Sequence, residues 1–427
     1  MRKLLLMVFM LPALFSSVTV ISTEKDPIFN EEEKYQFTST IYGPYFTDIP
    51  SNPNVYEEIP TFTDATLTKI AGKLVPNQPI SLAEFHVNKD GIPIFKLKNG
   101  QFVVAAKNIF YEDTIQTLED TNQEMWLKPN FIMYNGAYIN GVKKISTNLQ
   151  AYTKIKIVKL VTTHQGTYAQ IEGQGWVDVN FLSEEDNRME KVQEILNSKY
   201  NKSDYSIYVK QIESGKEAGI NEDMQMYSAS ITKLPYLYYV QKKLDENKLS
   251  LNEKMKYIEA VNNFSGAYVP EGSGSISKTA DNQDYSVQDL INRISKESDN
   301  VAHNILNYYV TNQSDNTFQQ TIENIAGKKW DVEGRQASAR MAGNIMEAIY
   351  EQNGVVIDAL SQTNFDNQRI SKNINVRVAH KIGDAYDFKH DVGVVYTDSP
   401  FVIAIFTNNS NYDTISQIAD DVYGVLK

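Results

Sequence analysis

The chain has 427 residues, 42% of them hydrophobic, which is enough for two or three domains with cores of their own. It has no cysteine, which excludes disulfide bonds, thiolate metal ligands and a thiol nucleophile. The formal net charge of −12 argues against a nucleic-acid partner, and the five histidines lack the spacing of metal ligands, so we expect neither a metal ion nor another cofactor.

The first 25 residues have the pattern of a targeting segment. Met1-Arg-Lys3 is positively charged, and an uncharged apolar stretch from Leu4 to Phe15 follows it, as in a secretory signal peptide. Because no clear cleavage site follows and apolar residues continue to Ile21, an uncleaved membrane anchor stays open as the alternative. In both cases we expect the rest of the chain to be extracellular, in the cell wall or at the outer face of the cytoplasmic membrane.

Residues 26–59 are polar, contain several prolines and tyrosines, and predict a spacer. Between residues 60 and 186 the sequence changes to short alternating segments. Among them, Pro93–Lys98, an Asn99-Gly100 turn and Gln101–Ala105 together form a strong hairpin signal.

This strand-like region contains an internal repeat, because the segment that ends at Asp186 aligns with the one that ends at Asp113. The matched pairs are Phe102 with Trp176, Val103 with Val177, and Asn108 with Asn180. The repeat predicts two small all-β domains, at 60–116 and 117–186.

The strand that combines glycine, an aromatic residue and valine, together with the short segment after it, resembles bacterial SH3-like domains. This resemblance implies two SH3-like barrels that bind a cell-wall polymer, either peptidoglycan or teichoic acid. The alternative is that both domains only hold the C-terminal region away from the membrane.

Helical and strand patterns are mixed from residue 187 to residue 427. Strands are expected at 205–215, 376–383, 392–396 and 401–406, and helices at 189–200, after the capping box at 286–289, from 301, at 337–350 and at 413–426. This order predicts an α+β domain in which helices face an antiparallel sheet.

One helix of this region carries a candidate nucleophile, in Ser230-Ile-Thr-Lys233. Residues three apart share a helix face, so the Lys233 amine can reach the Ser230 hydroxyl, and a lysine desolvated by apolar neighbours can act as a base. Pro235 predicts an irregular first turn. A second Ser-x-x-Lys match, Ser275–Lys278, follows a Gly/Ser-rich stretch and is interpreted as loop.

Two further motifs follow in order, Ser298-Asp-Asn300 between two predicted helices and Lys381-Ile-Gly383 on a predicted strand. With the Ser-x-x-Lys motif they resemble the penicillin-recognising serine hydrolases, and among them the class A β-lactamase type, over residues 187–427. Another Ser-Asp-Asn, at 314–316, is interpreted as an ordinary helix cap.

The resemblance implies a role for each of these residues. Ser230 would attack a carbonyl carbon and Lys233 would take its proton, while Ser298 would pass a proton to the leaving group. Asn300 would hold Lys233 or a substrate amide, and Lys381 would supply positive potential. The predicted enzyme is therefore an active-site-serine hydrolase.

The remaining expected site residues lie on the strand of Lys381. By resemblance, the backbone N–H groups of Ser230 and Asp384 would form the oxyanion hole, and Ile382 and Gly383 would face the substrate. The family usually has threonine or serine where Ile382 stands, and isoleucine cannot donate to a substrate carboxylate. The lost hydrogen bond would cost about 1.5–3 kcal/mol of binding.

A second departure concerns deacylation. Class A β-lactamases carry a Glu-x-x-Leu-Asn loop whose glutamate activates water, whereas the segment 327–336 leads directly to the next helix. Glu333 is followed by Gly-Arg-Gln and does not fit that motif. An acyl-enzyme formed with a β-lactam is therefore expected to be long-lived.

Three hypotheses remain. The first is a cell-surface acyl-hydrolase or acyltransferase that acts on D-alanyl amides or esters of peptidoglycan or teichoic acid. The second is a β-lactamase that hydrolyses β-lactams. The third is a non-catalytic wall-binding protein with a vestigial site.

Overall fold

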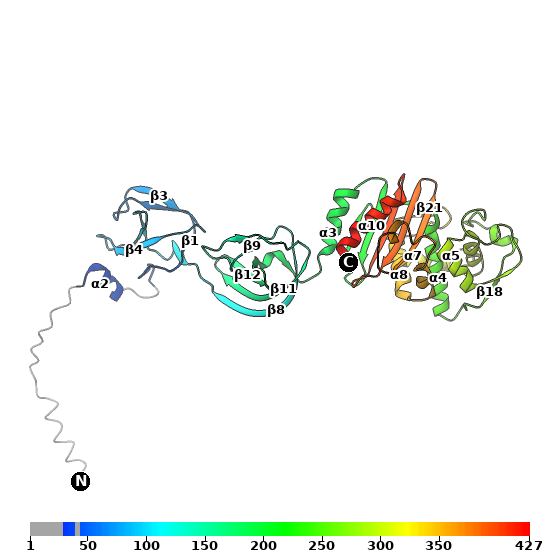
Figure 1. Ribbon diagram of the computed structural model, residues 1–427, viewed down its shortest axis with the longest axis horizontal. Coiled ribbons are helices and arrows are strands. Elements are labelled where there is room, and N and C mark those ends of the chain that lie inside the picture. Colours follow the sequence, from blue (N-terminus) through cyan, green and yellow to red (C-terminus); the bar gives the residue numbers. More distant parts are fainter. Residues whose placement is uncertain (1–28, 39–42) are drawn as a thin grey trace, which may run out of the picture. The chain divides into compact units, whose positions relative to one another are not determined.

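Figure 1 shows the computed structural model of the chain, which describes residues 29–38 and 43–427. The targeting segment predicted over residues 1–25 lies outside the described residues and stays a prediction. The chain divides into two compact units. The first comprises residues up to Gln123, Phe131–Asn148 and Lys156–Phe181, and the second Glu124–Asn130, Leu149–Ile155 and Leu182–Lys427. In the part of the chain that the structure describes, no helix is both long and apolar enough to span a membrane.

The first unit is rich in strands. One antiparallel sheet has the strand order β3-β2-β6-β5-β4, and β1 pairs with β7. The bounds are β1 Pro53–Val55, β2 Ile59–Phe62, β3 Ile70–Leu74, β4 Leu82–Val87, β5 Pro93–Leu97, β6 Phe102–Val104 and β7 Phe110–Glu112. The predicted hairpin is confirmed as β5 and β6, and Gly100 adopts a φ of +86° in its turn, which glycine accommodates without strain.

The structure differs from the spacer predicted over residues 26–59. A helix, α2 (Glu31–Thr38), lies within it, β1 occupies 53–55, and β2 begins at Ile59. Val55 and Ile59 are buried in the same core as Phe95 and Phe110. Strands of three or four residues show too little alternation to be recognised, and the partner of β1 lies far along the chain.

A second sheet has the order β10-β9-β13-β12-β11-β8-β14. Its strands are β8 Thr117–Leu127, β9 Met133–Tyr134, β10 Lys144–Ile145, β11 Lys154–Thr163, β12 Gly166–Ile171, β13 Trp176–Asp178 and β14 Leu182–Ser183. The repeated residues occupy equivalent places, because Phe102 opens β6 and Trp176 opens β13, and the valine after each is buried. The SH3-like identity of these sheets stays a prediction.

The C-terminal part contains a five-stranded antiparallel sheet, in the order β16-β15-β23-β22-β21. Its strands are β15 Tyr205–Gln211, β16 Glu217–Ile220, β21 Val378–Ala385, β22 Phe388–Val395 and β23 Phe401–Asn408. The predicted α+β architecture and its three consecutive C-terminal strands are confirmed. Helices α3 (Arg188–Ile195) and α10 (Tyr412–Leu426) share one core with this sheet.

A second core contains the remaining large helices. They are α4 Lys233–Asp245, α5 Val287–Glu297, α6 Asn300–Tyr309, α7 Asn316–Ala326, α8 Ala339–Gln352 and α9 Val355–Leu360. The predicted cap of α5 is present, because Ser286 Oγ accepts from the Asp289 N–H at 3.2 Å. Asp315 caps α7, as predicted for the second Ser-Asp-Asn. The short helix α9 was not predicted.

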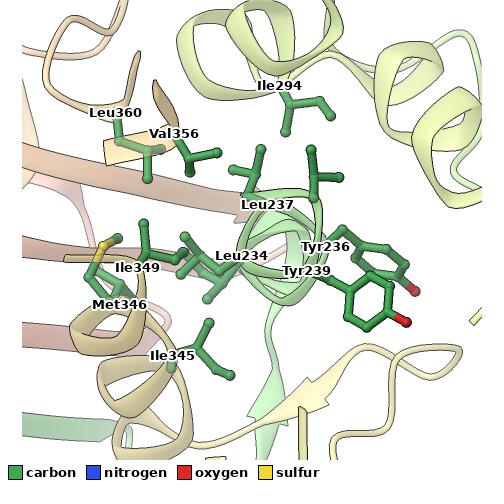
Figure 2. Close-up of a cluster of buried hydrophobic side chains, with 14 of the residues drawn as sticks. Leu234, Tyr236, Leu237, Tyr239, Ile294, Ile345, Met346, Ile349, Val356 and Leu360 are labelled. Carbon is green, nitrogen blue, oxygen red and sulfur yellow. The ribbon is translucent and has the colours of Figure 1, made fainter. Parts of the chain in front are cut away.

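Helix α4 lies at the centre of this core, as Figure 2 shows. Leu234 and Leu237 are completely buried among side chains of α8 and α9, including Ile349 and Val356. Burying each leucine contributes about 1.5–3 kcal/mol. The residues that follow Ser230 are therefore fixed by packing on several sides.

A charged pair lies buried in the sheet. His380 on β21 is fully buried, with Nδ1 2.9 Å from Asp391 Oδ2 and Nε2 3.2 Å from Asp366 Oδ1. Burial alone would lower the pKa of His380, but the two carboxylates outweigh it and raise that pKa to about 9. The imidazolium is therefore the stable form at neutral pH.

This pair predicts a pH-dependent contribution to stability. Because the folded pKa is raised, the contribution is fully present below pH 6.5 and is lost as the pH rises through about 9, an effect of about 3 kcal/mol. The His380→Asn/Asp391→Asn double variant removes both charges. Urea denaturation should show the stability gap between wild type and double variant narrowing by about that amount from pH 6 to pH 9.5. A constant or widening gap would contradict the assignment.

Candidate active site

Ser230 lies on a tight turn, as predicted. A 3-10 helix, η4 (Ala229–Thr232), precedes α4, and Ala229 adopts a φ of +48°, an uncommon value for a residue with a side chain. Pro235 is the third residue of α4, where its missing N–H has no intrahelical acceptor to lose. Ser230 is partly exposed, whereas Lys233 is completely buried.

The Lys233 amine contacts all three other groups expected beside it. Its Nζ lies 3.1 Å from Ser230 Oγ and donates to the Ser298 carbonyl at 2.6 Å and to Asn300 Oδ1 at 2.7 Å. The Asn300 amide nitrogen donates to the Val269 carbonyl, so its oxygen faces the lysine. A neutral amine has two N–H donors and one lone pair, so these two acceptors leave the lone pair for the Ser230 hydroxyl.

The surroundings of Lys233 favour that neutral form. Complete burial holds its pKa well below the usual value, and the positive charges of Lys381 and Arg335 lower it further. Asp299 acts in the opposite direction but does not outweigh burial. Among the described residues, no carboxylate is hydrogen-bonded to Lys233 or Ser230. The arrangement supplies a base next to a hydroxyl.

Ser298 lies between the two lysines. Its Oγ accepts from Lys381 Nζ at 2.8 Å and lies 3.3 Å from Lys233 Nζ, which provides a route for a proton. Ser298 ends α5 with a φ of +57°, and Asp299 then caps α6 by accepting from the Ala302 N–H. The predicted break between two helices is therefore confirmed.

Lys381 approaches from β21. Its side chain is buried, and it donates to the Ile382 carbonyl at 2.9 Å as well as to Ser298. Burial lowers the pKa of Lys381 to about 7, with Asp391 raising it and Arg369 lowering it. Lys381 therefore carries its charge below neutral pH and loses it above.

β21 is an edge strand of the sheet and lies against η4. A Cβ on Gly383 would lie 2.8 Å from the Ser228 carbonyl and from Ile231, so only glycine allows this close approach. The Ile382 carbonyl points to the side of Lys381, and backbone groups two residues apart point the same way. The Asp384 N–H is therefore directed to that side too, while the Ile382 side chain is buried.

The structure adds residues that the motifs did not indicate. The Tyr268 hydroxyl donates to the Ala229 carbonyl at 2.9 Å, and its ring lies 4.4 Å from Lys233 Nζ. The Arg335 guanidinium also lies over the Tyr268 ring, 4.0 Å from its centre. Asn304 holds Tyr268 through both backbone groups. Sequence spacing could not identify Tyr268, because its contact with the nucleophile turn is a hydrogen bond to a backbone carbonyl.

The loop interpreted from Ser275–Lys278 is confirmed as loop, and it also supports the site. The N–H groups of Ser275 and Ile276 donate to Asp299 Oδ2 at 2.7 and 2.9 Å. At Gly274, with a φ of +111°, a Cβ would lie 2.1 Å from the Asp299 carboxyl carbon. This Gly/Ser-rich segment fixes the position of Ser298.

The segment expected to lack a deacylating glutamate passes behind the nucleophile. The Arg335 carbonyl accepts from both the N–H and the hydroxyl of Ser228, at 2.7 and 2.9 Å. Glu333 is exposed and lies beside Gly266. The Arg335 guanidinium donates to the Gly266 and Ala267 carbonyls, and its positive charge lowers the pKa of Lys233.

The C-terminal part of the chain matches a known protein family. The model of the beta-lactamase enzyme family matches residues 187–426, more than half of the chain. The chain belongs to this family. None of the curated proteins matches it.

Several solved structures are similar to part of the chain. PBP-A is 18% identical, with a TM-score of 0.47 over 56% of this chain and 96% of that one. The beta-lactamase from Sphaerobacter thermophilus DSM 20745 is 17% identical, with a TM-score of 0.46 over 56% and 95%. The TLA-3 extended-spectrum beta-lactamase is 18% identical, with a TM-score of 0.46 over 56% and 98%.

The pKa of Lys381 predicts the pH dependence of Ser230 reactivity. A lysine with a pKa of about 7 is charged below that pH, so its attraction for a developing oxyanion is lost above it. The rate of Ser230 acylation by a fluorescent penicillin should fall about tenfold per pH unit above pH 7. Intact mass measured against time from pH 5 to pH 9 checks this. A rate that is flat between pH 7 and pH 9 would contradict it.

Gly274→Ala should inactivate the site by displacing the backbone, without removing any of the predicted catalytic side chains. The added Cβ collides with Asp299 and displaces Ser298, and a misplacement of about 1 Å can cost about a hundredfold in rate. Gly215→Ala is the matched control, because Gly215 also has a positive φ (+67°) but nothing within 4 Å of the new Cβ. Acylation should fall only in the Gly274 variant, although both variants lose stability.

Proposed function

We propose that the chain is a cell-surface active-site-serine acyl-hydrolase or acyltransferase that acts on D-alanyl amides or esters of peptidoglycan or teichoic acid. The observation that supports it most is the buried Lys233 amine, which lies 3.1 Å from Ser230 Oγ while the Ser298 carbonyl and Asn300 Oδ1 accept from it. Such an arrangement suits acyl transfer and has no evident structural purpose, since a buried lysine is costly to fold.

The proposed reaction has two halves. Ser230 Oγ attacks the carbonyl carbon as its proton passes to Lys233 Nζ, and the oxyanion accepts from the N–H groups of Ser230 and Asp384. The bond from carbon to the leaving nitrogen or oxygen then breaks, and that atom takes the proton from Lys233 through the Ser298 hydroxyl. Water or another hydroxyl or amine finally displaces Ser230 from the acyl group.

Two features favour wall substrates over efficient β-lactam hydrolysis. In the described part of the chain no carboxylate is bonded to Ser230 or Lys233, so nothing there resembles a base for a deacylating water. Ile382 offers no hydroxyl to a substrate carboxylate. β-Lactam hydrolysis is the alternative, and family membership is what favours it.

The N-terminal region has a proposed role too. We infer that residues 60–186 form SH3-like domains that bind the wall polymer, on the strength of the repeat and the equivalent strands that contain Phe102 and Trp176. The targeting segment would place the enzyme outside the cytoplasmic membrane. If the site is vestigial, Ser230→Ala should change nothing while deletion of residues 60–186 abolishes wall attachment. The first hypothesis instead expects Ser230→Ala to abolish acyl transfer.

Incubation with a fluorescent penicillin, followed by intact mass against time, tests the catalytic proposal. A single adduct should form on the wild type, persist for many minutes, and be absent from Ser230→Ala, which removes only the hydroxyl. Rapid loss of the adduct and turnover of the penicillin would favour the β-lactamase alternative. No adduct with this or any other activated acyl donor would favour the non-catalytic one.

A further inference from the structure

A buried guanidinium lies next to the strand that carries Lys381. The Arg369 side chain is 1% exposed, stacks on the Tyr412 ring at 3.7 Å, and lowers the pKa of Lys381 through its charge. Nη1 donates to Gln368, and the buried Nε has no partner among the described residues. A guanidinium this far from water requires an anion.

Asp384 is that anion. Its Oδ2 accepts from Arg369 Nη2 at 2.7 Å and from the Tyr412 hydroxyl, and its Oδ1 lies 2.9 Å from Lys389 Nζ. Burial alone would raise the pKa of Asp384, but the hydrogen bonds from Tyr412 and Lys389 and the charge of Arg369 lower it. Two cations and a hydroxyl are therefore arranged around one carboxylate, which is how a protein binds an anionic ligand.

This anion-binding group borders the reactive serine. Asp384 follows Gly383, whose backbone lies against the turn that carries Ser230, and its own N–H points to the side of Lys381. The Asp384 side chain is 29% exposed, so its carboxylate is partly accessible from solvent. Ile382 and Asp384 share one face of β21, because side chains two apart in a strand point the same way.

We propose that Asp384 is a specificity-determining residue: it fills the anion site of Arg369 and Lys389 with the chain's own carboxylate. A substrate with a free carboxylate in its leaving group is then repelled by the Asp384 carboxylate, because Asp384 already occupies the positive charges that would bind it. Esters and amides without that carboxylate meet no such penalty. The inference rests on the proposed acyl-transfer function of Ser230 and narrows its substrates to neutral or cationic acyl donors, such as D-alanyl esters.

Two thioesters that differ in a single charge test the inference. N-benzoyl-D-alanyl thioglycolate has a carboxylate in its leaving group, and its methyl ester has none; cleavage of both is followed by release of the thiol. The wild type should prefer the methyl ester. Asp384→Asn, which keeps the shape, and Asp384→Ala, which vacates the site, should each raise the ratio of kcat/KM for the thioglycolate to kcat/KM for the methyl ester by about ten- to a hundredfold. Both substrates use the same Asp384 N–H, so a change in the oxyanion hole alters both rates alike and leaves this ratio unchanged.

Asp387→Asn is the matched control. Asp387 is exposed in the turn between β21 and β22, so the substitution removes the same charge three residues away without touching Arg369. Its substrate preference should equal that of the wild type. A shift of equal size in this variant would attribute the effect to net charge and overturn the role of Asp384.

The outcomes separate this inference from the function on which it rests. Thiol release that depends on Ser230, with a preference unchanged by both Asp384 variants, overturns the inference and leaves the proposed function standing. Release that does not depend on Ser230 overturns the function.

A binding measurement needs no turnover. In a Ser230→Ala background, N-acetyl-D-alanine should raise the melting temperature of the Asp384→Ala protein and leave that of the protein with Asp384 unchanged. Equal shifts in the two proteins overturn the inference.

Discussion

The site depends on one buried amine. Lys233 is completely buried and, among the described residues, has no carboxylate partner. Its Nζ donates to the Ser298 carbonyl and to Asn300 Oδ1, and the hydroxyls of Ser230 and Ser298 lie farther away, at 3.1 and 3.3 Å. A charged ammonium in that position would bear the desolvation cost of an ion with no carboxylate to offset it. The neutral amine satisfies both of its N–H groups and leaves its lone pair unused. Packing of α4 between helices and sheet thus produces the base, since burial is what lowers the pKa of Lys233.

Backbone geometry around that amine is held by special positions in four separate segments. Ala229 and Ser298 have positive φ values without being glycine, and Gly274 and Gly383 permit contacts that any Cβ would prevent. The positive φ values of Ala229 and Ser298 each cost of order 1–3 kcal/mol and persist only where the surroundings fix them. Asp299 accepts three backbone N–H groups and thereby links the α5–α6 break to the loop before it. Placing Ser298 between Lys233 and Lys381 therefore costs the fold some stability.

The sequence predicts those parts of the site whose residues lie close together in one continuous segment. Ser230 and Lys233 are related by helix geometry, and Ser286 caps its own helix, so spacing alone places them. Lys381, Ser298 and Ser230 come from elements far apart in the chain, and only their order relative to a known family suggested that they meet. Sequence spacing has no means to show Tyr268 or the ion pair between Arg369 and Asp384, because those contacts depend on tertiary packing. Short strands such as β1 cannot be predicted from the sequence for a related reason, because the strand with which each one pairs is distant along the chain.

The charges around Ser230 indicate which of the two proposed steps, acylation or deacylation, the site favours. The charges of Lys381 and Arg335 act on Lys233, and the charge of Arg369 acts on Lys381. Each of the nearby carboxylates has a partner of its own. Asp299 is bonded to backbone N–H groups, Asp391 to His380, and Asp384 to Arg369. If Ser230 attacks a carbonyl as proposed, this positive potential would stabilise the oxyanion, whereas no carboxylate among the described residues is hydrogen-bonded to Ser230 or Lys233. On that proposal, formation of the acyl-enzyme is better provided for than its hydrolysis, which suits an enzyme whose acyl group leaves to an acceptor that is itself a good nucleophile.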